Sequence, residues 1–329
     1  MIDTELFRNL LSFDSTSGKE RPLAEWLMET LEAPEKKAFE VGDGTLNLLF
    51  SWGRPRLVFC THMDTVPPYI APEFLPGEVR GRGSCDAKGQ LLALYTACRR
   101  LASEGAEGFA LLLLSGEETG SWGAKAFSAT GFTAPYLLVG EPTENKLVSA
   151  SKGTRSYDLT FHGEAFHSGY PQYGVSAVTL FNDFCNALKA QDFGEDPDLG
   201  DTTWNIGLLH SDNPQNILSP ELRCRLYFRT TFVSDAPVRA WMSALPSSVS
   251  VMDRGGDAPA RYLTLPGFAS APVAFGSDAP HLTGFGRKMI CGPGSIRTAH
   301  RADEHVLLQD LETAVEQYVR IFRLLQQDD

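Results

Sequence analysis

The sequence lacks several features that would mark a secreted, membrane or nucleic-acid-binding protein. Its six cysteines include no Cys-x-x-Cys pair, a pattern typical of reduced thiols rather than of a disulfide framework. Its longest aliphatic run, about residues 109–114, is far shorter than a membrane span. The first residues have neither the basic segment nor the apolar stretch of a signal peptide, so we expect a cytoplasmic protein.

Basic residues are also in the minority. The 329 residues include 29 lysines and arginines against 41 aspartates and glutamates, which gives a formal net charge of −12. This balance argues against nucleic acid or an anionic membrane as the main partner. We find no internal repeat, and 43% of the residues are hydrophobic, so the chain can bury one large core or two of ordinary size.

Short apolar runs and helical patterns alternate in the first third of the sequence. The runs at 57–60, 109–114 and 136–139 are typical of buried strands, and helical spacing occurs at 20–31 and 90–101. This order predicts an α/β fold with a mixed, mostly parallel sheet that is covered on both faces.

The pattern changes near residue 152. Segments 156–162 and 224–230 alternate apolar and polar residues, as strands of an antiparallel sheet with one solvated face do. Helices are expected at 175–188 and 238–245. We therefore expect a small α+β domain inserted into the first one, whose pattern resumes later and ends in a helix at about 307–325.

Acids and a histidine stand where the predicted strands end. His62 follows the first strand, Glu117 and Glu118 follow the second, Glu141 follows the third, and Asp86 closes a glycine-rich loop. Ligands of open α/β sheets collect at the carboxyl ends of the strands, so we expect these side chains to converge. Imidazole and carboxylate ligands without thiolate suit zinc, with cobalt or manganese as alternatives.

Each of these residues also has an ordinary structural interpretation. Asp86 could cap the helix that follows it, and Glu117 and Glu118 could be acids in a first helical turn. Glu141 stands before a proline and could belong to a turn. Only the order and placement of all of them together favour a site.

Eight segments, spread over nearly the whole sequence, form an ordered set of motifs. They are residues 61–67, 81–89, 115–121, 139–143, 166–169, 216–218 with Arg229 beyond, 276–279 and 294–304. This set resembles the M20 family of dinuclear zinc amidohydrolases and exopeptidases, which includes acetylornithine deacetylase, succinyl-diaminopimelate desuccinylase and carboxypeptidase G-type enzymes. The resemblance implies a zinc-exopeptidase-type catalytic domain over 1–152 and 267–329, with an α+β lid or dimerisation domain inserted at 153–266.

The resemblance implies a centre with two divalent metal ions. His62 and Glu141 would bind one ion, Glu118 and His300 would bind the other, and Asp86 would bridge the two. Zinc is the first choice of metal, with cobalt or manganese as alternatives.

The resemblance also implies two residues that act beside the metals. Asp64 would hydrogen-bond the far nitrogen of His62 and fix its tautomer. Glu117 would be the general base that takes a proton from water and returns it to the leaving amine. Neighbouring side chains of an extended segment point to opposite sides, so Glu117 could face the water while Glu118 binds metal.

Four further residues are implied at the substrate. His167, in the inserted domain, would donate to the oxyanion, either across a dimer or after domain closure. Asn216 and Arg229 would lie near it and hold a substrate carboxylate, and Gly294 would offer a backbone amide. The inserted domain would also form the contact of a homodimer.

The function that these residues imply is deacylation of a small-molecule N-acyl amino acid. Residues 140–143 resemble the acetylornithine deacetylase and desuccinylase branch, which predicts a role in arginine or lysine biosynthesis. The alternative is an aminoacylase, dipeptidase or carboxypeptidase of the same family. A non-catalytic binding protein would lack a ligand or the base, and neither is missing; a scaffold or transport protein has only the acidic charge in its favour.

Overall fold

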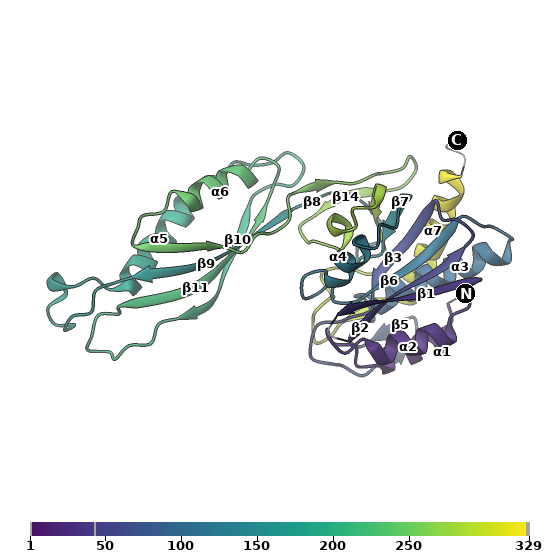
Figure 1. Cartoon of the computed structure of the whole chain (residues 1–329), viewed down its shortest axis with the longest axis horizontal. Coiled ribbons are helices and arrows are strands. Elements are labelled where there is room, and N and C mark those ends of the chain that lie inside the picture. The colour runs from purple at the N-terminus through teal and green to yellow at the C-terminus, as the bar shows by residue number, and fades with distance from the viewer. Residues whose placement is uncertain (1, 43, 327–329) are drawn as a thin grey trace. The chain divides into compact units, whose positions relative to one another are not determined.

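The computed structural model describes residues 2–42 and 44–326, which form two compact units with separate cores (Figure 1). The first unit comprises Met1–Ser149, Tyr262–Ala271 and Ser277–Asp329, and the second comprises Ala150–Arg261 and Pro272–Gly276. The expected inserted domain, 153–266, overlaps the long segment of the second unit over residues 153–261. None of the helices in the described ranges is long and apolar enough to cross a membrane.

A six-stranded mixed sheet organises the first unit. Its order is β1 (Glu35–Gly42), β2 (Thr45–Trp52), β6 (Phe109–Leu114), β3 (Leu57–His62), β7 (Ala134–Val139) and β15 (Phe285–Ile290). Strands β6, β3, β7 and β15 run parallel, whereas β2 is antiparallel to β6 and β1 is antiparallel to β2. The prediction of a mixed, mostly parallel sheet is confirmed.

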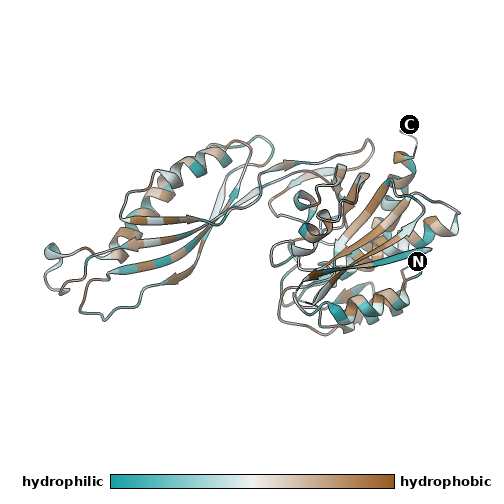
Figure 2. Cartoon of the chain, in the orientation of Figure 1, coloured by the Kyte–Doolittle hydropathy of each residue, from teal (hydrophilic) through white to brown (hydrophobic). Residues whose placement is uncertain are grey.

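The first two strands were not predicted from the sequence. Strand β1 is an edge strand whose first residues, Glu35, Lys36 and Lys37, are all exposed, so it contains no apolar run. Charges on an edge strand discourage pairing with another chain. Strands β3 and β6, in contrast, are buried at every residue, and the central strands of this sheet carry the hydrophobic colour in Figure 2.

Helices cover the sheet of the first unit. They are α1 (Thr4–Ser12), α2 (Arg21–Thr30), α3 (Lys88–Ser103), α4 (Trp122–Ser128) and α7 (Leu308–Leu325). Helix α3 packs against β3, β6 and α7, and α4 packs against β1 and β2. Helix α1 was not predicted; Asp3 caps it by accepting a hydrogen bond from the backbone N–H of Leu6 at 2.9 Å, and Phe7 and Leu10 are buried in the core.

The second unit is an antiparallel sheet with helices on one face (Figure 1). The sheet has the order β10 (Thr203–His210), β11 (Glu221–Thr230), β9 (Gly153–His162) and β12 (Val249–Asp253), and the helices are α5 (Ala177–Ala190) and α6 (Asp235–Ser243). Burial alternates along β9 and β11, with Tyr157, Leu159 and Phe161 in the core. This alternation explains why the alternating apolar and polar residues of the sequence predicted both strands.

The remaining elements are short. Strands β4 (Glu73–Leu75), β5 (Glu78–Arg80) and β16 (His305–Leu307) form one three-stranded sheet, and β8 (Leu147–Ser151), β13 (Ala260–Arg261) and β14 (Ser270–Val273) form another. Two 3₁₀ turns are η1 (Pro171–Tyr173) and η2 (Ala279–His281). Strand β16 places the segment after residue 300 beside β5, just ahead of the glycine-rich loop.

Candidate metal centre

The candidate centre lies at the carboxyl ends of three neighbouring parallel strands. Strand β3 ends at His62, β6 ends just before the segment with Glu117 and Glu118, and β7 ends just before Glu141. Because β6, β3 and β7 are adjacent and parallel, their carboxyl ends lie at one edge of the sheet. Asp86 reaches the same place from the loop before α3.

One group of candidate ligands is fully buried. It consists of His62, Asp86 and Glu141, each of which offers an atom within 4.8 Å of the others. The His62 Nε2 atom is 3.1 Å from Asp86 Oδ1. Glu141 is 4% exposed, and its Oε1 has no hydrogen-bond partner among the described residues. A buried carboxylate oxygen without a donor is costly, and a bound cation would satisfy it.

A second group shares Asp86 with the first. Asp86, Glu118 and His300 again offer atoms within 4.8 Å of one another. The His300 Nε2 atom is 2.8 Å from Glu118 Oε1 and 3.3 Å from Asp86 Oδ2. The Asp86 and Glu118 carboxylates raise the pKa of His300 to about 10, which shows how strongly this position favours positive charge. These donors fit a divalent cation of the zinc type.

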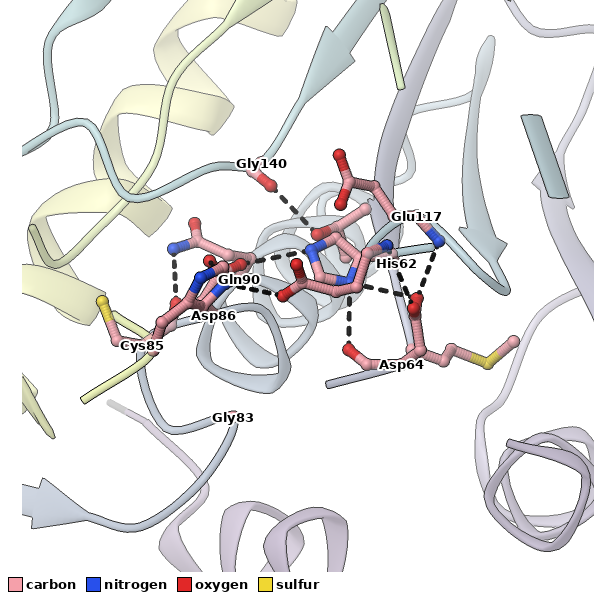
Figure 3. Close-up of polar contacts among 12 residues, drawn as sticks. His62, Asp64, Gly83, Cys85, Asp86, Gln90, Glu117 and Gly140 are labelled. Carbon is pink, nitrogen blue, oxygen red and sulfur yellow. Dashed lines mark hydrogen bonds and ion pairs between the residues drawn. The ribbon is translucent and has the colours of Figure 1, made fainter. Parts of the chain in front are cut away.

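Asp64 links His62 to the segment with the two glutamates (Figure 3). His62 Nδ1 is 3.0 Å from the backbone carbonyl oxygen of Asp64 and 3.3 Å from its Oδ1, and the other ring nitrogen faces Asp86. The same carboxylate accepts hydrogen bonds from the backbone N–H groups of Glu117 and Glu118, at 3.0 and 3.1 Å. Burial alone would raise the pKa of Asp64, but the contacts with His62, the Ser17 hydroxyl and the Glu117 N–H together hold that pKa below its usual value.

Glu117 lies beside both groups and is not part of either. It shares a third cluster of candidate ligands with His62 and Glu118. Burial raises the pKa of Glu117 well above its usual value. The segment is a turn, closed by a hydrogen bond from the N–H of Gly120 to the carbonyl of Glu117 at 3.0 Å, so the expectation of an extended segment was wrong. The turn and the anchoring by Asp64 are what orient the two adjacent acids.

The second unit brings together only some of the expected substrate residues. The carbonyl of Asn216 accepts a hydrogen bond from the N–H of Ser168 at 2.9 Å, so Asn216 lies beside His167. Arg229 pairs with Thr154 of β9 and lies eight residues along β11 from Glu221. Eight residues of an extended strand span roughly 26 Å. Arg229 therefore lies far along β11 from its Glu221 end, whereas His167 pairs with Ile217 in the segment just before Glu221.

Two more residues of the first unit bear on the site. Gly294 has φ +76°, and a Cβ there would lie 2.6 Å from Cys85 Sγ, so only glycine fits. Asp278 received no role from the sequence, although its motif was recognised. It is 1% exposed, burial raises its pKa to about 6, and its charge acts on Glu117 and Glu141.

Glu20 provides a test of burial next to the site. It is completely buried, its Oε1 accepts a hydrogen bond from the N–H of Gly116 at 3.1 Å, and burial raises its pKa to about 7. The folded state therefore keeps a proton between about pH 4.5 and 7 that the unfolded state releases, so stability falls as pH rises through this window. We expect the free energy of unfolding of Glu20→Gln to fall by about 2 kcal/mol less than that of the wild type as the pH rises through this window.

The measurement is denaturant unfolding between pH 5 and 8 in the presence of chelator. Glu29→Gln, at an exposed position of α2, the helix that follows Glu20, is the control and should follow the wild-type pH dependence. A Glu20→Gln curve parallel to the wild type over the whole range would contradict the expectation.

The family model described as Peptidase family M20/M25/M40 matches residues 58–324. This chain belongs to that family. A peptidase M20 domain-containing protein of Schizosaccharomyces pombe is 32% identical over 96% of this chain and 83% of its own length. A protein of Aspergillus terreus named "Probable carboxypeptidase" is 29% identical over 95% of this chain and 84% of its own length.

Solved structures share the fold at low sequence identity. A tripeptidase from Staphylococcus aureus matches with a TM-score of 0.81 at 19% identity, covering 98% of this chain and 99% of its own. An M20 family metallo-carboxypeptidase from Sulfolobus solfataricus matches with a TM-score of 0.75 at 15% identity, covering 98% of both chains. A dinuclear metal-binding peptidase from Bacillus subtilis matches with a TM-score of 0.70 at 10% identity, covering 98% of this chain and 97% of its own. These matches confirm a mixed α/β fold, and the family membership confirms a metallopeptidase-type hydrolase.

Proposed function

We propose that this member of the family is a two-metal hydrolase that cleaves the linear amide of an amino-acid derivative. The observation that carries the proposal is Asp86, whose two oxygens face two separate groups of ligands. His62 and Glu141 complete the first group, and Glu118 and His300 complete the second. Zinc is the metal we propose, with cobalt or manganese as alternatives, because the donors are imidazole and carboxylate.

The roles of the side chains follow from their contacts. Bound divalent cations supply Lewis-acid chemistry, which polarises an amide carbonyl and lowers the pKa of water. Asp64 holds the His62 ring so that Nε2 faces Asp86. Glu117, half-buried and with a raised pKa, takes the proton of the attacking water and delivers it to the departing amine. We propose His167 as a donor to the oxyanion.

The substrate we propose has a free carboxylate on the amine side of the cleaved bond. An N-acyl amino acid and a peptide cleaved by a carboxypeptidase share this feature and differ only in the acyl part. The resemblance of residues 140–143 to the acetylornithine deacetylase and desuccinylase branch supports an acetylornithine deacetylase-like reaction in arginine or lysine biosynthesis. The relatives named as carboxypeptidases support the peptide as the second candidate. Asn216, Arg229 and Gly294 are the proposed substrate contacts.

The remaining expectations belong to the same proposal. The second unit would act as a lid and as the contact of a homodimer. All six cysteines are free thiols, which supports a reducing, cytoplasmic location.

Release of free amine from matched substrates tests the proposal. Each pair has one C-terminal amino acid, such as ornithine or lysine, acylated by acetyl in one member and by an aminoacyl group in the other. The carboxamide of each compound is the control for the free carboxylate. We expect one pair to be cleaved, its carboxamides to be poor substrates, and a chelator to abolish the release until zinc or cobalt is restored. Release that survives complete removal of metal would contradict the proposal.

A further inference from the structure

A buried carboxylate lies behind the loop that carries Asp86 (Figure 3 shows the loop). Glu304 is 1% exposed, and its Oε1 accepts hydrogen bonds from three backbone N–H groups of this loop. The donors are Gly83, Cys85 and Asp86, at 2.9, 3.1 and 3.1 Å. Three donors that converge on one anionic oxygen fix the backbone of the loop around it.

The second oxygen of Glu304 also has a donor. Oε2 accepts a hydrogen bond from Nη1 of Arg82, which is 2% exposed. The same nitrogen donates to the carbonyl of Arg301, the residue after His300, at 3.2 Å. Glu304 is absent from the three clusters of candidate ligands, and both of its oxygens are engaged. It therefore acts through its neighbours and not as a metal ligand.

These contacts tie together two ligands that are far apart in the sequence. Asp86 follows directly on the loop that Glu304 holds, and Glu304 itself comes four residues after His300. The backbone adds a further link, because the N–H of Gly81 donates to the carbonyl of Glu304 at 3.0 Å. The Glu304 side chain thus contacts the backbone beside Asp86 from the segment that carries His300.

We propose that Glu304 is a positioning residue that holds Asp86 where it can bridge two metal ions. The inference rests on the proposed metal centre. Loss of a partner behind a metal ligand typically costs about 10–100-fold in metal affinity. A merely structural role would lower the stability of the metal-free protein and leave its metal affinity unchanged.

Two variants separate the loop contacts from the ion pair. Arg82→Met removes the ion pair but leaves the Glu304 oxygen facing its three N–H donors. The double variant Arg82→Met/Glu304→Leu removes both, without leaving an arginine buried and unpaired. Zinc stoichiometry and affinity are measured by competition with a chelating dye, and the absorption spectrum of the Co²⁺ form reports the coordination geometry. Ile321→Ala, a buried change in α7, is the control for lost stability alone.

We expect the wild type to bind two zinc ions, and the double variant to bind the second ion at least about tenfold more weakly than Arg82→Met does. The Co²⁺ spectrum of the double variant should also differ from that of Arg82→Met, whereas Ile321→Ala should lower only the melting temperature. Equal affinities in the single and double variants would overturn the inference while the metal centre stands. Fewer than two zinc ions in the wild type would overturn the metal centre and the inference with it.

A variant that keeps the side-chain shape covers the case in which the double variant does not fold. Glu304→Gln retains an oxygen acceptor but loses the charge, and it is compared with Ile321→Ala at the same metal concentrations. A weaker second zinc site in Glu304→Gln than in Ile321→Ala supports the inference, and equal sites overturn it.

Discussion

Glu117→Ala is expected to lower kcat by about 10²–10⁴-fold while both metal ions stay bound. Glu117 lies next to His62 and Glu118, but the contacts of the two histidines are made by Asp64, Asp86 and Glu118. Removing its carboxylate therefore takes away the proton acceptor and leaves both ligand groups complete. The measurement combines turnover of the best substrate with metal content by mass spectrometry.

The adjacent acid is the matched comparison. Glu118→Ala removes the carboxylate that lies 2.8 Å from His300 Nε2, so it should lose one metal ion as well as activity. The two variants change neighbouring residues by the same number of atoms and should differ in metal content. If Glu117→Ala also loses metal, Glu117 is a ligand and its assignment as the base is wrong.

Asp86→Asn is expected to have the broadest effect, because Asp86 alone takes part in both ligand groups. The substitution removes a negative charge that faces His62 on one side and His300 on the other. We expect the second metal ion to be lost and kcat to fall by more than about 100-fold. This loss exceeds the effect of removing a residue that only hydrogen-bonds a metal ligand. Titration with zinc, followed by activity at each step, measures both effects.

Asp303→Asn is the control for charge near the same loop. Asp303 is exposed and pairs with Arg301, so its removal should leave metal content and activity near the wild type. A variant Asp86→Asn that still binds two zinc ions as tightly as the wild type would show that Asp86 is not the bridge.

The sequence predicted those elements whose burial leaves a simple pattern. Strands β3, β6 and β7 are apolar because they are covered on both faces, and β9 and β11 alternate because only one face is covered. Strand β1 is exposed and charged, so it carries no such pattern. Helix α1 was missed although Asp3 before it is a suitable cap.

The candidate ligands could be named from the sequence because a parallel sheet brings the ends of its strands to one edge. His62 ends the first of three apolar runs in the sequence, and Glu117 and Glu141 follow the other two. In the fold, all three residues lie at one edge of the sheet. The set of motifs likewise identified the family, which the match over residues 58–324 confirms. Neither the strand ends nor the motifs show which atoms of the candidate ligands face one another.

The tertiary structure decided those relations. Sequence order cannot show that Asp64 contacts both His62 and the turn with Glu117, or that N–H groups of the Asp86 loop donate to Glu304. These contacts join segments that only packing brings together. The tertiary structure also set the place of Arg229, because the register of β11 with β9 puts it opposite Thr154 and eight residues from Glu221. The sequence by itself determined the family and the chemical types of the candidate ligands; the packing of distant segments determined the geometry in which they meet.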